Sequence, residues 1–85
     1  MEHEEVRRAV IETVRRFADP ALDAAALHEG AALITDLHVN SVHVVDLVLE
    51  LEDRFGLRMD DDVIEKMRTI GDIVDYIASR AAPSP

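Results

Sequence analysis

Ser41 is the residue of this chain whose type and setting most clearly suggest chemistry. It lies between Asn40 and Val42, at the start of an apolar and acidic run that continues to Phe55. The spacing of the apolar residues predicts a helix for this run but does not bury the serine, so its hydroxyl should face solvent. A hydroxyl at the entrance of a helix on a small acidic domain indicates a group that another protein modifies.

The histidines near this serine do not supply a catalytic site. His38 and His43 flank it, but no third group is placed to orient either imidazole, and no oxyanion site is evident. We therefore expect surface imidazoles and predict no catalytic residue. None of the 4 histidines has metal-ligand spacing with matching carboxylates, and the chain has 0 cysteines, so we also predict no metal site and no disulfide.

The composition predicts one small packed domain with basic protein partners. The 85 residues are 48% hydrophobic, which suffices for a core of limited size. The 18 acidic residues outnumber the 9 basic ones and give a net charge of −9. This charge disfavours nucleic acid and anionic membranes and favours partners with basic patches. No apolar stretch reaches the roughly 18 residues that cross a bilayer, and the acidic start is not a signal peptide. We therefore expect no membrane insertion and a cytoplasmic location.

The first half of the chain is predicted to hold one helix and a long loop. Apolar residues at helical spacing predict a first helix from about Glu2 to Phe17, which Asp19-Pro20 should end. The connection from Ala18 to Val39 is rich in alanine and should hold a short helical turn near Leu22–Leu27. Three leucines should fix this loop to the core: Leu27, Leu33 and Leu37.

The second helix is predicted from Ser41 to Phe55, and it carries two apolar stripes. Asn40 is a good N-cap residue, and Gly56 suits the C′ position. One stripe should pack in the core: Val44, Leu47, Val48, Leu51 and Phe55. The other borders acidic residues: Val42, Val45 and Leu49. An exposed apolar strip with an acidic rim indicates an interaction surface, although this strip could instead be the edge of a wide buried face.

Two further helices complete the predicted fold. A short one should run from about Asp60 to Lys66, and Thr69 should cap the last helix, with Asp72 at the capping-box position. The chain is therefore predicted to be all-α. We expect a small four-helix bundle of three longer helices and one short helix, with a long loop between the first and second. The domain should span residues 1–80, followed by a disordered tail at residues 81–85.

The stretch from Leu33 to Ile77 resembles an acyl carrier protein. The matching residues align without a gap: Asp36-Leu37, Ser41 with an aliphatic neighbour, Asp46-Leu47-Val48, Leu51-Glu52-Asp53-Arg54-Phe55, Asp61-Asp62, Glu65-Lys66, Thr69-Ile70 and Asp75-Tyr76-Ile77. In this family the serine of an Asp-Ser-Leu motif is esterified by 4′-phosphopantetheine, and Ser41 is the matching position. The resemblance implies a non-catalytic carrier that holds acyl groups as thioesters on this arm. It also implies that an acyl chain can insert between the second and third helices.

Departures from the family pattern predict a specialised carrier. Asn40-Ser41-Val42 replaces Asp-Ser-Leu, so the cap is kept and one negative charge is lost. We place Asn40 and Val42 beside Ser41 in the cofactor site. His38 stands where glycine is usual, and His43 where an acid is common; either imidazole could contact the phosphate of the arm. We therefore expect a specialised lipid or polyketide-type pathway rather than housekeeping fatty-acid synthesis.

The resemblance implies two kinds of partner. One is the phosphopantetheinyl transferase that installs the arm, and the other is the set of enzymes that transfer or modify acyl groups. We expect each partner to have a basic patch that docks on the second helix of this carrier. We also expect the carrier to be a monomer. The apolar centre of this docking face should be Val42, Val45 and Leu49, and its acidic rim Asp46, Glu50 and Asp53, with Glu52 at the edge. Exposed ion pairs stabilise by about 0–1 kcal/mol each, so the complexes should be transient.

Two other functions are compatible with the sequence. A peptidyl or aminoacyl carrier of non-ribosomal synthesis typically has Gly-Gly before His-Ser or Asp-Ser, whereas this chain has His38-Val39-Asn40. An unmodified acidic helical module used only for protein contacts would leave Ser41 free. The intact mass after co-expression with a phosphopantetheinyl transferase distinguishes this module from both carriers.

Overall fold

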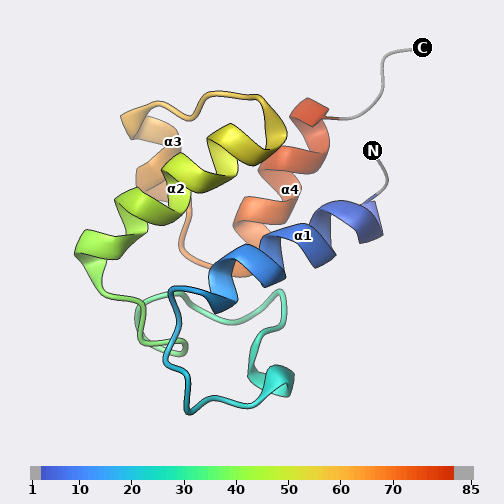
Figure 1. Cartoon of the computed structure of the whole chain (residues 1–85). Coiled ribbons are helices and arrows are strands. Elements are labelled where there is room, and N and C mark those ends of the chain that lie inside the picture. Colours follow the sequence, from blue (N-terminus) through green and yellow to red (C-terminus); the bar gives the residue numbers. More distant parts are fainter. Residues whose placement is uncertain (1–2, 82–85) are drawn as a thin grey trace.

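The computed structural model describes residues 3–81, and these form a bundle of four α-helices (Figure 1). The helices are α1 His3–Arg15, α2 Ser41–Phe55, α3 Asp61–Lys66 and α4 Ile70–Ala81, with a 3-10 turn η1 at Ala24–Ala26. Within this range there is no strand, only an isolated bridge between Ala32 and Thr69. The prediction of an all-α bundle with three longer helices and one short helix is therefore confirmed.

The predicted boundaries differ from the structure near both ends of the chain. Glu2 and residues 82–85 lie outside the described residues, and Ala81, expected in the tail, is the last residue of α4. α1 ends at Arg15 rather than at Phe17. The reason is that the N–H of Phe17 bonds to the carbonyl of Val14, three residues back, at 2.9 Å. This tighter turn often ends an α-helix.

The core lies where α1, α2 and α4 meet. α1 packs most extensively against α4 and also contacts α2. The largest side chains with almost no exposure come from these helices and from the loop: Val6, Val10, Val14, Leu33, Leu37, Val39, Leu47, Leu51, Ile70, Ile73, Val74 and Ile77. Between residues 3 and 81, no helix combines the length and the apolar character that crossing a membrane requires.

The long loop between α1 and α2 is fixed to the rest of the fold. The three leucines predicted to fix it are buried: Leu27, Leu33 and Leu37. Its backbone also bonds to the start of α4, because Leu33 donates to the carbonyl of Arg68 at 2.9 Å and Ile70 donates to the carbonyl of Ala31 at 3.1 Å. In Figure 1 the loop lies at the end of the bundle where α1 stops and α2 begins. The backbone that leads into α2 is therefore held in place.

The ends of the later helices have the caps that the sequence predicts. Gly56 follows α2 with a φ of 65°, in the left-handed region that glycine adopts at low cost. At the start of α4, Thr69 Oγ1 accepts from the N–H of Asp72 at 3.1 Å. Asp72 Oδ2 accepts in return from the N–H of Thr69 at 3.1 Å. This reciprocal pair is the predicted capping box, with Asp in place of the more common Glu.

Candidate functional site

Ser41 is the first residue of α2, and it is exposed. Buried residues fix the chain on both sides of it. Val39, two positions earlier, is 1% exposed, and its N–H donates to the carbonyl of Leu33 at 2.9 Å. Leu47, within α2, is fully buried. The serine is thus a solvent-facing residue on a rigid element, as the sequence predicts.

Asn40 caps the helix that begins with Ser41. Its side-chain Oδ1 accepts from the N–H of Val42 at 2.9 Å, and its backbone carbonyl accepts from the N–H of His43 at 2.8 Å. The residue is extended, with φ −64° and ψ 137°, as an N-cap requires. The positive end of the helix dipole therefore lies at Ser41, where an attached phosphate group is electrostatically favoured.

A groove of about 540 Å³ opens beside Ser41. Three parts of the chain line it: the loop with Ala32, Leu33, Ile34 and Thr35; α2 with Ser41 and Val44; and the α3 region with Ile64, Glu65, Met67 and Arg68. Most of these side chains are apolar, and Ile34 is 54% exposed at the surface. An exposed hydroxyl at a helix N-terminus next to an apolar groove fits a phosphate-linked arm with an acyl chain.

Neither histidine near Ser41 is placed as its general base. His38 and His43 are both exposed. The ring of His43 lies 6.4 Å from that of Phe17, at a tilt of 57°. His38 has a φ of 57°, and it is the single residue other than glycine with a positive φ in the described part of the chain. No side-chain hydrogen bond between residues 3 and 81 joins Ser41 to either imidazole.

The second apolar stripe of α2 is exposed, which answers the question that the sequence left open. Val42 is 71% exposed, Val45 53% and Leu49 56%. These three residues, called here the apolar strip, lie on one side of α2 with Asp46 and Asp53, which are also exposed. An exposed apolar surface with an acidic rim is characteristic of a protein-interaction site.

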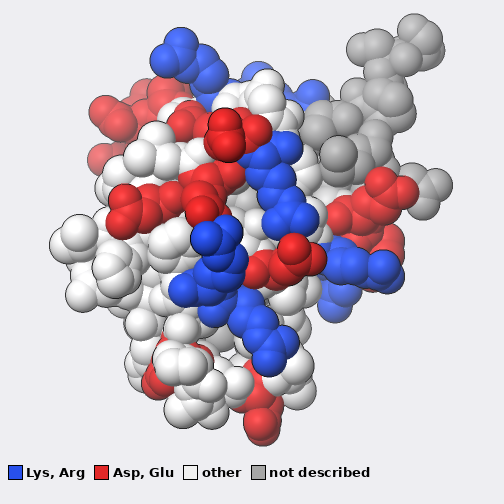
Figure 2. Space-filling model, viewed as in Figure 1, with Lys and Arg blue, Asp and Glu red and all other residues white. Residues whose placement is uncertain are grey.

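The other two acids of the predicted docking face bond within the molecule. Glu50 Oε2 lies 2.6 Å from the NH1 nitrogen of Arg16. Glu52 is half-buried, and its Oε2 accepts from the N–H of Met59 at 2.6 Å, so it stabilises the chain between α2 and α3. Figure 2 shows acidic and basic side chains interleaved over the face formed by α1 and α2. The acids of α2 are therefore not equally free to meet a partner.

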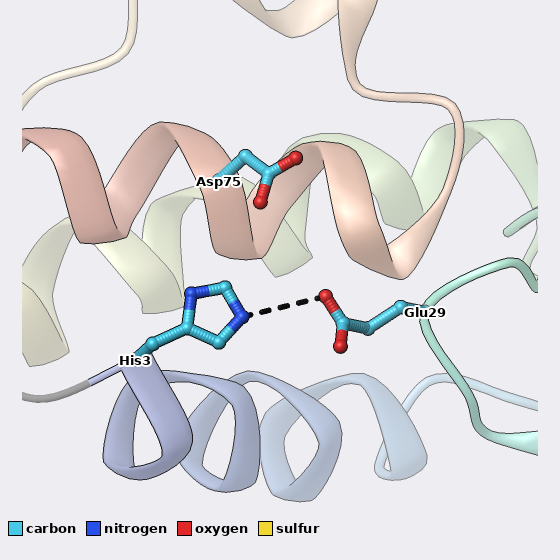
Figure 3. A group of neighbouring side chains, drawn as sticks. All are labelled: His3, Glu29 and Asp75. Atoms are coloured by element: carbon cyan, nitrogen blue, oxygen red, sulfur yellow. Dashed lines mark ion pairs between the residues drawn. The ribbon is translucent and has the colours of Figure 1, made fainter.

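One group of titratable side chains was not predicted from the sequence. His3, Glu29 and Asp75 offer ligand atoms within 4.8 Å of one another (Figure 3). Glu29 lies 3.6 Å from His3 Nε2 and, through its other oxygen, 3.6 Å from the Nε of Arg7. Since the guanidinium of Arg7 also lies beside Glu29, this carboxylate joins α1 to the loop through exposed surface contacts. No sequence signal indicates it, because its members come from α1, the loop and α4.

Comparisons with known proteins agree on one family. Residues 8–77 match the family model described as "Phosphopantetheine attachment site". The acyl carrier protein of Thermotoga maritima is 44% identical over 59 residues, which cover 69% of this chain and 73% of that protein. That of Lactobacillus acidophilus is 40% identical over 58 residues, covering 68% and 72%. The solved acyl carrier protein from Enterococcus faecalis superposes with a TM-score of 0.77 at 37% identity, over 93% of this chain and 98% of that one.

Proposed function

The chain belongs to the acyl carrier protein family, whose members are non-catalytic carriers of covalent 4′-phosphopantetheine, and from this premise we propose that Ser41 is its attachment residue. One observation carries the proposal. Ser41 is exposed at the capped start of α2, beside a groove that it helps to line. It also lies within residues 8–77, which match the family model.

The residues around Ser41 have distinct parts in this function. The arm, when bound, supplies a terminal thiol on which acyl groups are held as thioesters, which a chain with 0 cysteines cannot supply itself. Asn40 keeps α2 capped, so the helix end that favours the phosphate remains ordered. Val42 is 71% exposed next to the attachment residue and offers apolar surface to the arm or to a partner.

The groove beside Ser41 is the proposed site for the acyl chain. Its lining is mainly aliphatic, with Ile34, Val44 and Ile64 contributed by three different parts of the chain. Removing an alkyl chain from water is favourable by about 0.8 kcal/mol per buried methylene. An acyl group on the arm would therefore be stabilised in this groove while the carrier is not bound to a partner enzyme.

The proposed cargo belongs to a specialised lipid or polyketide-type pathway. The support comes from residues that depart from the usual pattern next to the attachment site. Asn40 replaces an aspartate, and His38 occupies a left-handed backbone position where glycine is usual. Since His43 also stands where an acid is common, the surface near Ser41 offers a partner fewer acids and more imidazoles than the usual pattern, which favours dedicated partners.

The proposed partners are a phosphopantetheinyl transferase and acyl-handling enzymes with basic docking patches. The apolar strip would supply the centre of the contact. Of the four acids of the predicted docking face, Asp46 and Asp53 are exposed and take part in none of the ion pairs found between residues 3 and 81. Glu50 would contribute only where Arg16 is displaced. Glu52, which bonds to Met59, would add to the local field without a direct contact.

The attachment residue can be tested by intact mass spectrometry. After co-expression with a broad-specificity phosphopantetheinyl transferase, the wild type should gain the mass of one phosphopantetheine, and Ser41→Ala should gain none. Ser79→Ala is the matched control, because Ser79 is also exposed but lies on α4, where its hydroxyl donates to the carbonyl of Tyr76 at 2.8 Å. If several transferases leave the wild type unchanged, and Ser41→Ala has no effect in the native host, the chain is an unmodified interaction module.

A further inference from the structure

The contact between Arg16 and Glu50 joins the turn that follows α1 to the middle of α2. The two residues are 34 positions apart, and Arg16 NH1 donates to Glu50 Oε2 at 2.6 Å. The side chain of Arg16 is 64% exposed and that of Glu50 37%. A hydrogen bond between two charged groups at this distance is stronger than a neutral one, although solvent weakens it at the surface. The carboxylate of Glu50 therefore presents less net charge to a partner than it would without Arg16 beside it.

Of the two adjacent arginines at positions 15 and 16, Arg16 is the one that pairs with an acid of α2. Arg15 is next to Arg16 and also exposed, but it takes part in none of the ion pairs found between residues 3 and 81. On α2, Arg54 pairs with Glu12 of α1 at 3.3 Å. Along the rim of the apolar strip, Asp46 and Asp53 take part in none of the ion pairs found between residues 3 and 81, whereas Glu50 is paired with Arg16. The cation at position 16 thus changes the charge pattern at the middle of α2.

We propose that Arg16 is a specificity-determining residue, which competes with a cation of the phosphopantetheinyl transferase for Glu50. The inference rests on the proposed docking function of α2. A transferase whose basic patch follows the whole rim must displace Arg16 before it can use Glu50. The carrier consequently binds such a partner more weakly than it would without the contact between Arg16 and Glu50. This arrangement favours partners whose cations meet only Asp46 and Asp53.

The test compares two charge-matched variants. Arg16→Gln should lower both the KM of the carrier and its Kd for the transferase, measured without coenzyme A, by roughly two- to fivefold at low salt. The kcat should not change, because Arg16 does not line the groove beside Ser41 and its hydrogen bond goes to Glu50. Arg15→Gln removes the same charge from the adjacent position and should have a smaller effect. At high salt the two variants should converge with the wild type.

A second background isolates the pair from the general effect of charge. In the Glu50→Gln background, Arg16→Gln should lower the Kd by no more than Arg15→Gln does, because the carboxylate that pairs with Arg16 is absent. Equal effects of the Arg16 and Arg15 variants in both backgrounds, or weaker binding by Arg16→Gln, would overturn the inference. Thermal unfolding checks that each variant is folded. Binding without transfer to Ser41 would refute the proposed attachment residue but would leave the competition testable through Kd.

Discussion

His38 adopts a backbone conformation that a side chain makes costly. Its φ of 57° lies in the left-handed region, where a residue with a Cβ costs about 1–2 kcal/mol. A β-branched residue is the least tolerant of this region. We expect His38→Val to lower the free energy of unfolding by about 1 kcal/mol, because the branched Cβ of valine adds to the cost that histidine already has at this φ. His38→Gly should be neutral or slightly stabilising, because relief of strain offsets the extra entropy of an unfolded glycine. Urea unfolding at equilibrium measures both.

The control for this prediction is another exposed residue of the same loop. Thr35 has a negative φ, since His38 is the single positive-φ residue other than glycine in residues 3–81. Thr35→Val should therefore change the free energy of unfolding far less than His38→Val does. Equal losses from the two variants would show that the loop tolerates valine poorly everywhere, and that the backbone angle at position 38 is not the cause.

At the scale of single residues, the sequence predicted local roles and missed those that depend on distant partners. Ser41 and Asn40 were assigned from neighbours within a few positions, and the structure places them as expected. The sequence places Glu50 on the acidic rim of the docking face, but in the structure it accepts from Arg16, which is 34 positions away. The sequence carries no register that relates α1 to α2. Side-chain pairs between these two parts of the chain therefore require the packed structure.

The cap of α2 couples the stability of a helix to the attachment site. Asn40 Oδ1 satisfies the N–H of Val42, so Asn40→Ala should lower the free energy of unfolding by about 1 kcal/mol. Asn40→Asp keeps the acceptor and adds a charge that the helix dipole favours by about 0.3–1 kcal/mol. Its stability should equal or exceed that of the wild type. Thermal unfolding followed by circular dichroism separates the two variants.

The same pair of variants also reports on docking. If the missing acid weakens engagement of the transferase, Asn40→Asp should be modified faster than the wild type at low salt, and the difference should shrink as salt rises. Asn40→Ala should show no such gain. A loss of stability in Asn40→Asp would contradict the role of the side chain as a helix cap.

At the scale of elements, helices were predictable and their exact ends less so. The apolar periodicity and the caps predicted α2 with its observed bounds, from Ser41 to Phe55. For α1, apolar spacing extended the prediction to Phe17, whereas the α-helix ends at Arg15. Phe17 is half-buried and packs against the core from a tighter turn. Hydrophobic spacing indicates which residues face the core. Over a single turn, an α-helical turn and a tighter 3-10 turn can both direct Phe17 toward the core, so the spacing does not show where the α-helix ends.

At the scale of the whole molecule, the net charge of −9 opposes the compact state. The Cα radius of gyration is 12.0 Å, and the screening length is about 30 Å at 0.01 M salt and about 10 Å at 0.1 M. At low salt, then, most of the acids repel one another across the entire domain. The surface ion pairs act in the opposite direction, but each is exposed and contributes little: Arg7 with Glu4 and Glu29, Arg16 with Glu50, and Arg54 with Glu12.

The balance between these two effects predicts how salt acts on the domain. Raising the salt from 0.01 to about 0.3 M should raise the Tm by several degrees, because it screens the net repulsion more than it weakens a few exposed pairs. Asp61→Asn/Asp62→Asn removes two exposed charges at the start of α3 and should reduce this rise. Salt should weaken docking over the same range, since attraction to a basic partner is screened in the same way. A Tm that falls as salt is added would contradict this prediction. It would mean that the surface ion pairs, including those of Arg16 and Arg54, stabilise the bundle by more than the net repulsion destabilises it.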